Sequence, residues 1–454
     1  MAGFKIKGIK LYTMLLPIKN YKASQQIIAI MLLLLVTISC KTSTNAVVNT
    51  ASNYTEGPLK IKQELTKKGV FNTPNFEFSN EYIAAFNQDN IKGLFFDGLP
   101  YKGKKTKVFC WYGEPKNIDK TKKTPAVVLV HGGGGTAFPQ WVKEWNDRGY
   151  IAISIALEGQ VPGERIKDIE GKLQHPTFQY SGPQRQGFFL DVINEKLEDQ
   201  WFFHAVADVI MAKKILQSFP QVDENNIGIT GISWGGILTN VITGLDNSFA
   251  FAVPVYGCGF LQETPHYSKM LARLTKEQQD FYLKNWEPSL YVTLQKQPTL
   301  FVNGTNDFHF TMNSFTKTFE ASNTEKYLYV KHNMKHGHGP GWEPETIYNF
   351  ANYITKNGNK PQSVVFKNTH ANNTLTFSST DNIKSAKLYY TTNFADWGDK
   401  SYSWIETDAN INKNSISVNL PKKAVAYFLN TTNPEGIEYS TPMTFINKTS
   451  NEKK

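Results

Sequence analysis

The segment around Ser233 constrains the fold of this chain more than any other. The motif G-x-S-x-G, centred on Ser233, follows an apolar run over 226–230 that is typical of a buried strand. An apolar segment over 236–242, typical of a helix, comes directly after it. A strand that turns into a helix this tightly strains the serine backbone, and small residues are needed where the two elements nearly touch. Such a turn projects the Ser233 hydroxyl out of the sheet and places the N–H of Trp234 to stabilise an oxyanion. The alternative is a chance glycine-rich turn, which the flanking pattern disfavours.

The first 40 residues predict an export signal that ends in a lipidated cysteine. The apolar run over 27–36 is too short for a comfortable membrane span but suits the core of a signal peptide. It leads to Cys40 and then to a polar segment, which resembles a bacterial lipoprotein signal. The alternative is ordinary secretion with cleavage near Ser39. We therefore expect an exported protein of the bacterial cell envelope, in the periplasm or at the outer membrane, anchored to the membrane by a lipid on Cys40.

The formal net charge of +10 over 454 residues does not indicate nucleic acid as a partner. Half of that charge comes from lysines of the signal segment, which contains no acidic residue before Cys40: Lys5, Lys7, Lys10, Lys19 and Lys22. The remaining charge is too weak to argue for nucleic-acid binding. We expect no cofactor, and the sequence does not indicate an oligomeric state. Cys110 and Cys258 are expected to be buried thiols rather than a disulfide.

The chain divides into four predicted segments: a lipoprotein signal over 1–40, a polar tether over 41–60, a catalytic domain over 61–358 and an accessory β-sandwich over 359–454. From residue 125, continuous apolar strands alternate with helices, which predicts an α/β domain with a mostly parallel sheet covered on both faces. Beyond residue 360, short alternating segments separated by Asn, Asp, Gly and Pro predict a small all-β, immunoglobulin-like sandwich.

The C-terminal part of the predicted catalytic domain supplies a candidate acid and a candidate base for Ser233. A serine hydroxyl becomes nucleophilic when a base takes its proton, and the base needs an acid that orients it. Asp307 follows the predicted strand over 299–303 and is the expected acid; its alternative role is a helix N-cap or turn residue.

Three histidines follow the next predicted strand, over 327–331, and compete for the role of base. We expect His336 to be the base, with His338 as second choice and His332 as a distant third. His338 could instead contact substrate or pack in the core. A metal site at the H-x-H pair is disfavoured, because Ser233 and Asp307 already supply a complete constellation without metal.

The loop after the first parallel strand supplies candidate oxyanion donors. His131 is followed there by four glycines, which allow the backbone to approach a substrate carbonyl closely. We assign Gly133 and Gly134 to the oxyanion hole together with Trp234, and the sequence leaves the choice between the two glycines open. The alternative is a flexible turn.

These segments together resemble the α/β-hydrolase superfamily over roughly residues 94–356. The resemblance rests on the glycine loop after His131, the run over 222–236, Gly304-Thr305-Asn306-Asp307 and His336-Gly337-His338. It is nearest to the branch that contains dienelactone hydrolase, acetyl xylan esterase and the prolyl oligopeptidase catalytic domain, and it implies a catalytic triad in the chain order Ser, Asp, His. Ser233 argues against dienelactone hydrolase chemistry, where the nucleophile is cysteine. The short N-terminal region cannot supply the propeller of prolyl oligopeptidases. The C-terminal sandwich is not part of the superfamily pattern.

We therefore expect an exported serine esterase that hydrolyses carboxylic esters on an acylated carbohydrate through an acyl-enzyme. Acetyl esters are the first choice. The alternatives are a serine peptidase of prolyl oligopeptidase type and a non-catalytic, glycan-binding lipoprotein. Two segments, 159–199 and 257–290, stand where superfamily members build lids. Their aromatic residues are expected either to stack on sugar rings or to pack the lid: Phe178, Tyr180, Phe188, Phe189, Tyr267, Phe281 and Trp286.

Overall fold

The computed structural model describes residues 56–84, 91–168, 170–187, 194–379, 381–393 and 403–446. The export signal with Cys40, and the predicted tether up to residue 55, therefore lie outside the described residues. Residues 56–60 were expected to be the end of the tether, but they belong to a helix over 56–67. Its apolar side chains Ile61 and Leu65 are fully buried, so hydrophobic contact fixes this segment to the domain. No helix within the described ranges is long and apolar enough to cross a membrane.

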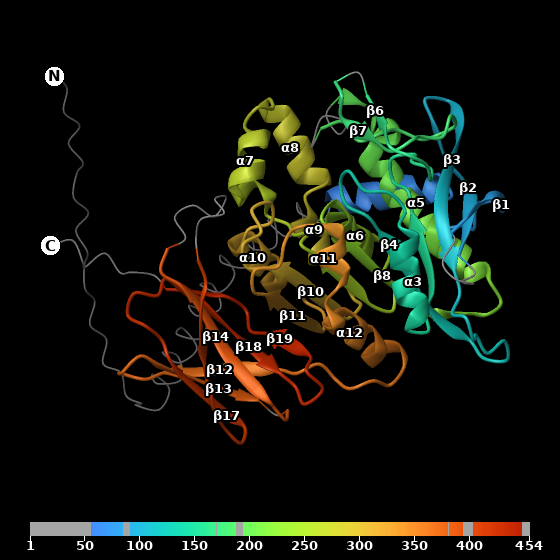
Figure 1. The fold of residues 1–454 in the computed structure, drawn as a ribbon. Helices are drawn as coiled ribbons and strands as arrows, with labels where there is room; N and C mark the ends of the chain where they lie inside the picture. Colours follow the sequence, from blue (N-terminus) through green and yellow to red (C-terminus); the bar gives the residue numbers. More distant parts are fainter. Residues whose placement is uncertain are drawn as a thin grey trace, which may run out of the picture. The chain divides into compact units, whose positions relative to one another are not determined.

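Nine strands of the described chain form the central sheet of the larger domain, in the order β1-β2-β3-β5-β4-β8-β9-β10-β11 (Figure 1). The first three strands pair antiparallel, and the other six run parallel to one another. Their bounds are β1 (Phe76–Ile83), β2 (Lys92–Tyr101), β3 (Lys104–Gly113), β4 (Thr124–Val130), β5 (Ile151–Ile155), β8 (Val222–Ile232), β9 (Ala252–Val255), β10 (Thr299–Gly304) and β11 (Lys326–Lys331).

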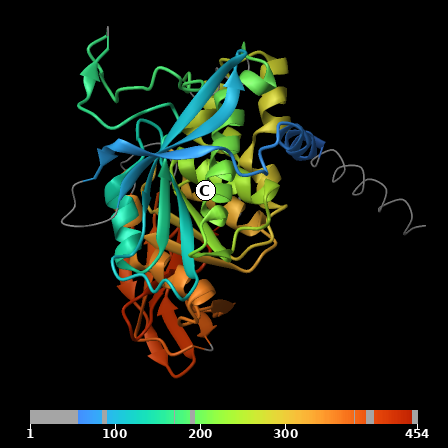
Figure 2. The same cartoon turned by 90° about the vertical axis from the view of Figure 1, so that its right-hand side faces the viewer.

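The parallel strands are apolar on both sides because helices cover both faces of the sheet (Figure 2). On one face α3 and α12 pack together, with the rings of Trp145 and Tyr348 4.8 Å apart. On the other face lie α5, α6, α9 and α10. Helix α5 is apolar almost all round and is buried over most of its length, as expected for a helix inside a domain. The bounds are α3 (Pro139–Asp147), α5 (Trp201–Ser218), α6 (Trp234–Leu245), α9 (Pro288–Val292), α10 (Met312–Ala321) and α12 (Glu345–Thr355).

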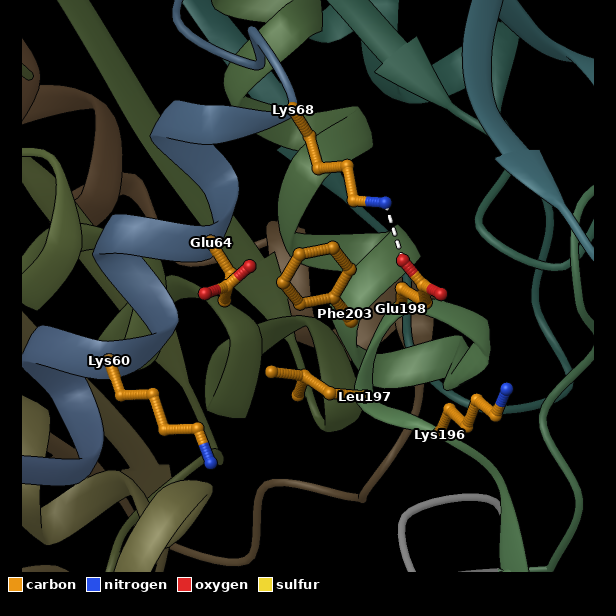
Figure 3. A pocket seen from close by; sticks show the side chains of 7 residues that line it. All are labelled: Lys60, Glu64, Lys68, Lys196, Leu197, Glu198 and Phe203. Carbon is orange, nitrogen blue, oxygen red and sulfur yellow. Dashed lines mark hydrogen bonds and ion pairs between the residues drawn. The ribbon is translucent and has the colours of Figure 1, made fainter.

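Two insertions and one short helix complete the domain. The first insertion holds β6 (Ile166–Lys167), β7 (Leu173–Gln174) and η1 (Leu197–Asp199), and the second holds η2 (Leu261–Glu263), α7 (Pro265–Leu271) and α8 (Lys276–Asn285). Helix α11 (His338–Trp342) follows the predicted base. A hollow of about 220 Å³ lies between the helix over 56–67 and η1, where Lys68 pairs with Glu198 (Figure 3). None of the predicted site residues lines this hollow, so it marks the docking of the N-terminal helix rather than the site of Ser233.

The C-terminal region is a sandwich of two antiparallel sheets. One sheet has the order β12-β13-β17-β16; in the other β15-β14-β18-β19 pair in order and β20 joins β18. Side chains of both sheets, including Phe377, Leu388 and Leu429, form its core. The bounds are β12 (Val364–Thr369), β13 (Thr374–Ser379), β14 (Ser385–Thr391), β15 (Ile405–Asp408), β16 (Asn410–Asn412), β17 (Ser415–Asn419), β18 (Ala426–Thr432), β19 (Glu438–Ser440) and β20 (Thr444–Phe445). The predicted fold class, a mostly parallel α/β domain with a small all-β domain after it, is confirmed.

The sandwich contacts the last strand of the parallel sheet directly. The amide of Asn430 donates to the carbonyl of Val330 at 3.0 Å, and the N–H of Val330 donates to the hydroxyl of Ser440 at 2.7 Å. The hydroxyl of Tyr329 donates to Glu438 at 2.7 Å. Polar side chains of β18 and β19 thus satisfy the backbone N–H and carbonyl of Val330 on β11.

Candidate active site

The turn between β8 and α6 holds Ser233 in a strained conformation, with φ 59° and ψ −114°. Positive φ is uncommon for a residue that has a Cβ atom, and it persists only where the surroundings impose it. Steric crowding imposes it here. A Cβ atom at Gly231 would collide with the carbonyl oxygen of Gly235, and one at Gly235 would collide with the carbonyl oxygen of Val130. The two glycines of the motif are therefore required by close packing between β8, α6 and β4.

The structure brings Ser233, His336 and Asp307 together, as the sequence predicts. The hydroxyl of Ser233 lies 3.0 Å from Nε2 of His336, and Nδ1 of His336 lies 2.6 Å from Oδ2 of Asp307. The three residues stand beyond the carboxyl ends of β8, β11 and β10, which lie at one edge of the parallel sheet. An imidazole held between a carboxylate and a hydroxyl can accept the hydroxyl proton while the carboxylate stabilises the resulting cation.

The surroundings of Asp307 and His336 restrict both side chains to this geometry. Oδ1 of Asp307 accepts the N–H groups of His309 at 2.8 Å and Phe310 at 2.9 Å, which leaves Oδ2 directed at His336. The ring of Tyr256 lies 4.5 Å from the ring of His336, and that of Phe310 lies 6.0 Å from it. The Tyr256 hydroxyl also donates to the backbone carbonyl next to His336 in sequence, at 2.6 Å. The imidazole is thus held by aromatic neighbours as well as by hydrogen bonds.

The second-choice base, His338, does not stand beside Ser233. Its Nε2 atom accepts the N–H of Gly132 at 2.9 Å, and its ring packs 4.8 Å from that of Phe138. Burial lowers the pKa of His338 to about 4, so the ring is neutral at pH 7 and serves as an acceptor. His332, the third choice, faces the sandwich, with its ring 5.0 Å from that of Tyr389.

The glycine loop lies against the serine turn, and its residues differ in their surroundings. A Cβ atom at Gly132 would come within 2.9 Å of the Cβ atom of Ser233. A Cβ atom at Gly133 would lie 3.1 Å from the Trp234 ring, whereas one at Gly134, where φ is +70°, would meet nothing within 4 Å. Between the two glycines that the sequence left open, the geometry favours Gly133 as the partner of Trp234. The role of these groups as oxyanion donors stays a prediction.

Arg185 is a residue of the site that sequence reasoning missed. Its guanidinium lies over Gly133 and 5.8 Å from the Trp234 ring. It donates to the carbonyl of Gly187 at 2.7 Å and to the carboxylate of Glu158 at 3.4 Å. No sequence signal distinguishes this arginine from the other charged residues of the insertion over 159–199. Only the fold carries the insertion back over the glycine loop.

A cleft of about 760 Å³ begins at the glycine loop and continues beneath the β6–β7 hairpin. Gly134 and Gly135 are among its lining residues. Its walls carry amide side chains and charges of both signs: Gln160, Gln174, Gln184, Asp168, Lys172 and Arg185. The cleft at the glycine loop is therefore lined mainly by groups that donate or accept hydrogen bonds.

Comparison with known proteins finds a match to the family model for acetyl xylan esterase (AXE1) over residues 75–289. The model for PhoPQ-activated pathogenicity-related protein matches residues 241–398. The structure of acetyl xylan esterase from Paenibacillus sp. R4 is 18% identical with a TM-score of 0.53, covering 66% of this chain and 95% of that one. Acetyl xylan esterase 1 from Thermoanaerobacterium sp. JW/SL YS485 is 17% identical with a TM-score of 0.52, covering 66% and 94%.

The fold is that of the α/β-hydrolases. The superfamily resemblance seen in the sequence is thereby confirmed. Among curated proteins, dipeptidyl-peptidase 5 of Aspergillus oryzae is 24% identical over 192 residues, which are 40% of this chain and 22% of that protein. The chain thus spans about a fifth of the length of the curated relatives it matches. Together these matches support a hydrolase, and they include both esterases and peptidases.

The predicted lid aromatics mostly pack the interior of the domain. Tyr267 and Trp286 are buried, and the indole N–H of Trp286 donates to Gln200 at 2.8 Å. The ring of Phe178 lies 5.0 Å from that of Phe95, and Phe281 is partly buried against the core. Tyr180 is 56% exposed. Phe188 and Phe189 lie outside the described residues.

The remaining predictions concern cysteines and metals. Cys110 and Cys258 are both buried and unpaired, and burial raises the pKa of each thiol. Within the part of the chain that the structure describes, no group of three or more His, Cys, Asp or Glu side chains could hold a metal ion.

We predict that Gly235→Ala destabilises the α/β-hydrolase domain by more than about 3 kcal/mol, because the added methyl group collides with backbone that cannot move alone. Urea denaturation measures the effect. Gly339→Ala is the matched control, since a Cβ atom there meets nothing within 4 Å. Equal stability of the two variants would contradict the steric explanation of the motif.

We also predict that His338→Gln flattens the acid dependence of stability. Because the folded pKa of His338 is about 4, below the ordinary value near 6.5, its contribution is complete above pH 6.5 and is lost as the pH falls towards 4. Between pH 6.5 and 5 the loss from this group amounts to about 1.6 kcal/mol. Glutamine can still accept the Gly132 N–H but does not titrate. Denaturation at both pH values should show a smaller decrease in the free energy of unfolding for the variant than for wild type. His370→Gln, at an exposed position, is the control.

Proposed function

We propose that this protein is a serine esterase that removes acyl groups, with acetyl as the first choice, from polysaccharide or oligosaccharide. The single observation that carries this proposal is the hydrogen-bonded series Ser233–His336–Asp307 at a strained turn. A strained serine in contact with a partly buried, carboxylate-oriented imidazole is costly to maintain unless the hydroxyl reacts.

In the proposed mechanism, His336 accepts the proton of the Ser233 hydroxyl while Oγ bonds to the ester carbonyl carbon. The carbonyl oxygen becomes negatively charged and is stabilised by the N–H groups of Gly133 and Trp234. The carbon–oxygen bond of the ester then breaks, and His336 gives its proton to the departing sugar oxygen, which leaves as a hydroxyl group. Water next loses a proton to His336 and attacks the acyl carbon. The bond from that carbon to Oγ then breaks, the carboxylic acid leaves, and His336 returns the proton to Oγ of Ser233. Asp307 orients the imidazole and remains ionised throughout.

The composition of the cleft supports a carbohydrate as the alcohol part of the ester. Sugar hydroxyls need donors and acceptors at fixed positions, and the cleft beside Gly134 offers Gln160, Gln174 and Gln184 together with side chains of both charges. The family-model match and the two esterase structures, named for acetyl xylan, support the acetyl group as the first substrate to test. We further propose that the protein is exported and lipid-anchored at Cys40.

A serine peptidase is the second candidate, because the curated relatives that match this chain are dipeptidyl-peptidases. The same series of side chains would cleave an amide, with His336 protonating the departing amine. The third possibility, a glycan-binding protein without catalysis, requires that the Ser233 hydroxyl be unreactive.

We predict that a fluorophosphonate probe labels the purified protein and that Ser233→Ala abolishes the labelling. The proposal further predicts acetate release from natively acetylated polysaccharides and little hydrolysis of aminoacyl or prolyl anilides. Peptide cleavage without acetate release would establish the peptidase instead. Absence of labelling in the folded wild-type protein would contradict the proposal and favour the glycan-binding protein without catalysis.

We predict that Asp307→Asn lowers kcat by about 10⁴-fold, because an amide cannot hold the imidazole in the required tautomer. Hydrolysis of an aryl acetate measures the change. Asp147→Asn, on the surface of α3, is the matched control and should retain full activity. An Asp307→Asn variant within tenfold of wild type would refute the assignment of the acid.

A further inference from the structure

Thr305 connects the two loops that carry Asp307 and His336. Its N–H donates to the carbonyl of Lys331 at 3.1 Å, and its hydroxyl accepts the N–H of Asn333 at 3.0 Å. Lys331 is the last residue of β11, so the first bond joins the loop after β10 to the end of β11, and the second joins it to the loop after β11. Thr305 is fully buried, and no solvent competes for these contacts.

A third hydrogen bond of Thr305 comes from the C-terminal sandwich. The indole N–H of Trp404 donates to the carbonyl of Thr305 at 3.1 Å. Trp404 precedes β15 and is 6% exposed, and its ring packs 5.2 Å from that of Phe428 on β18. A buried indole N–H needs an acceptor, and the packing of the ring aims this one at the loop of Asp307.

The sandwich also contacts the loop that carries His336. The ring of His332, the first residue after β11, lies 5.0 Å from that of Tyr389 on β14. Nδ1 of His332 lies 3.8 Å from a carboxylate oxygen of Glu406 on β15. Tyr389 in turn stacks 5.1 Å from Phe428, the residue that supports Trp404. One aromatic cluster of the sandwich therefore meets both loops.

We infer that the C-terminal sandwich is a structural part of the active site and that Trp404 is a positioning residue, which acts through Thr305 to fix Asp307 relative to His336. This inference rests on the proposed function. Asp307 and His336 stand on separate loops. The short hydrogen bond between them requires the distance between the two loops to stay constant. Thr305 sets that spacing from within the hydrolase domain, and Trp404 prevents Thr305 from moving away.

Replacing Trp404 with phenylalanine tests the inference, because an aromatic ring is kept while the N–H is lost. We expect kcat for an aryl acetate, and the rate of fluorophosphonate labelling, to fall about tenfold with KM within twofold of wild type. Trp145→Phe is the matched control: Trp145 is also buried, packs among aromatic rings, and its indole N–H has no hydrogen-bond partner within the described structure. The control should lose stability while keeping kcat within twofold.

Thr305→Val provides a second variant, since it removes both the acceptor for the Asn333 N–H and the donor to Oδ1 of Asn306 while it preserves the side-chain shape. If Trp404 acts through Thr305, the double variant should lose less than the product of the two single losses. A Trp404→Phe variant with wild-type kcat and labelling rate would overturn the inference. So would a double variant whose loss equals the product of the two single-variant losses. If Trp404→Phe does not fold, the kcat and the labelling rate of Thr305→Val test the inference instead. Wild-type protein that is not labelled would instead refute the proposed function.

Discussion

The close approach of three backbone segments at Ser233 is the constraint on which the rest of the structure depends. Strand β8, helix α6 and the end of β4 come so near one another that a single methyl group at Gly235 has no room. This crowding holds Ser233 at positive φ and presses the glycine loop against the same point. The parallel sheet then supplies two further strand ends beside the turn, from which Asp307 and His336 reach the hydroxyl.

The two neighbouring histidines show how environment separates residues of one type. His336 stands between a carboxylate and a hydroxyl, where an imidazole can exchange protons. His338 is packed against Phe138, and burial keeps its pKa so low that it is an acceptor for backbone near neutral pH. His131 repeats the second pattern: burial lowers its pKa to about 3, and its Nε2 accepts the N–H of Leu157 at 3.0 Å. Both neutral imidazoles thus bond to the backbone of Gly132 at the start of the glycine loop.

The fold class and the convergence of Ser233, Asp307 and His336 could be predicted from the sequence, because both follow from local patterns. Continuous apolar runs specify buried parallel strands, and loops at their carboxyl ends meet at one edge. Strand β1 gave no such signal, since most of its residues are exposed. The helical end of the expected tether was also missed, because Ile61 and Leu65 are buried only by contact with distant parts of the chain.

The supporting residues of the site could not be predicted, because they act across long separations in sequence. Arg185 reaches Gly133 only after the insertion folds back, and Trp404 reaches Thr305 from another domain. Neither residue belongs to a motif with a fixed spacing. The choice between Gly133 and Gly134 likewise depended on what each faces in space.

The contact between the sandwich and β11 has a consequence for how the molecule behaves in concentrated solution. β11 is the last strand of the sheet, and an open border strand exposes backbone groups that recruit strands from other molecules. Asn430 and Ser440 occupy the carbonyl and the N–H of Val330 with side chains instead. These side chains occupy the backbone groups of Val330 without adding a further strand to the sheet. The sandwich therefore shields the edge strand β11 from pairing with strands of other molecules.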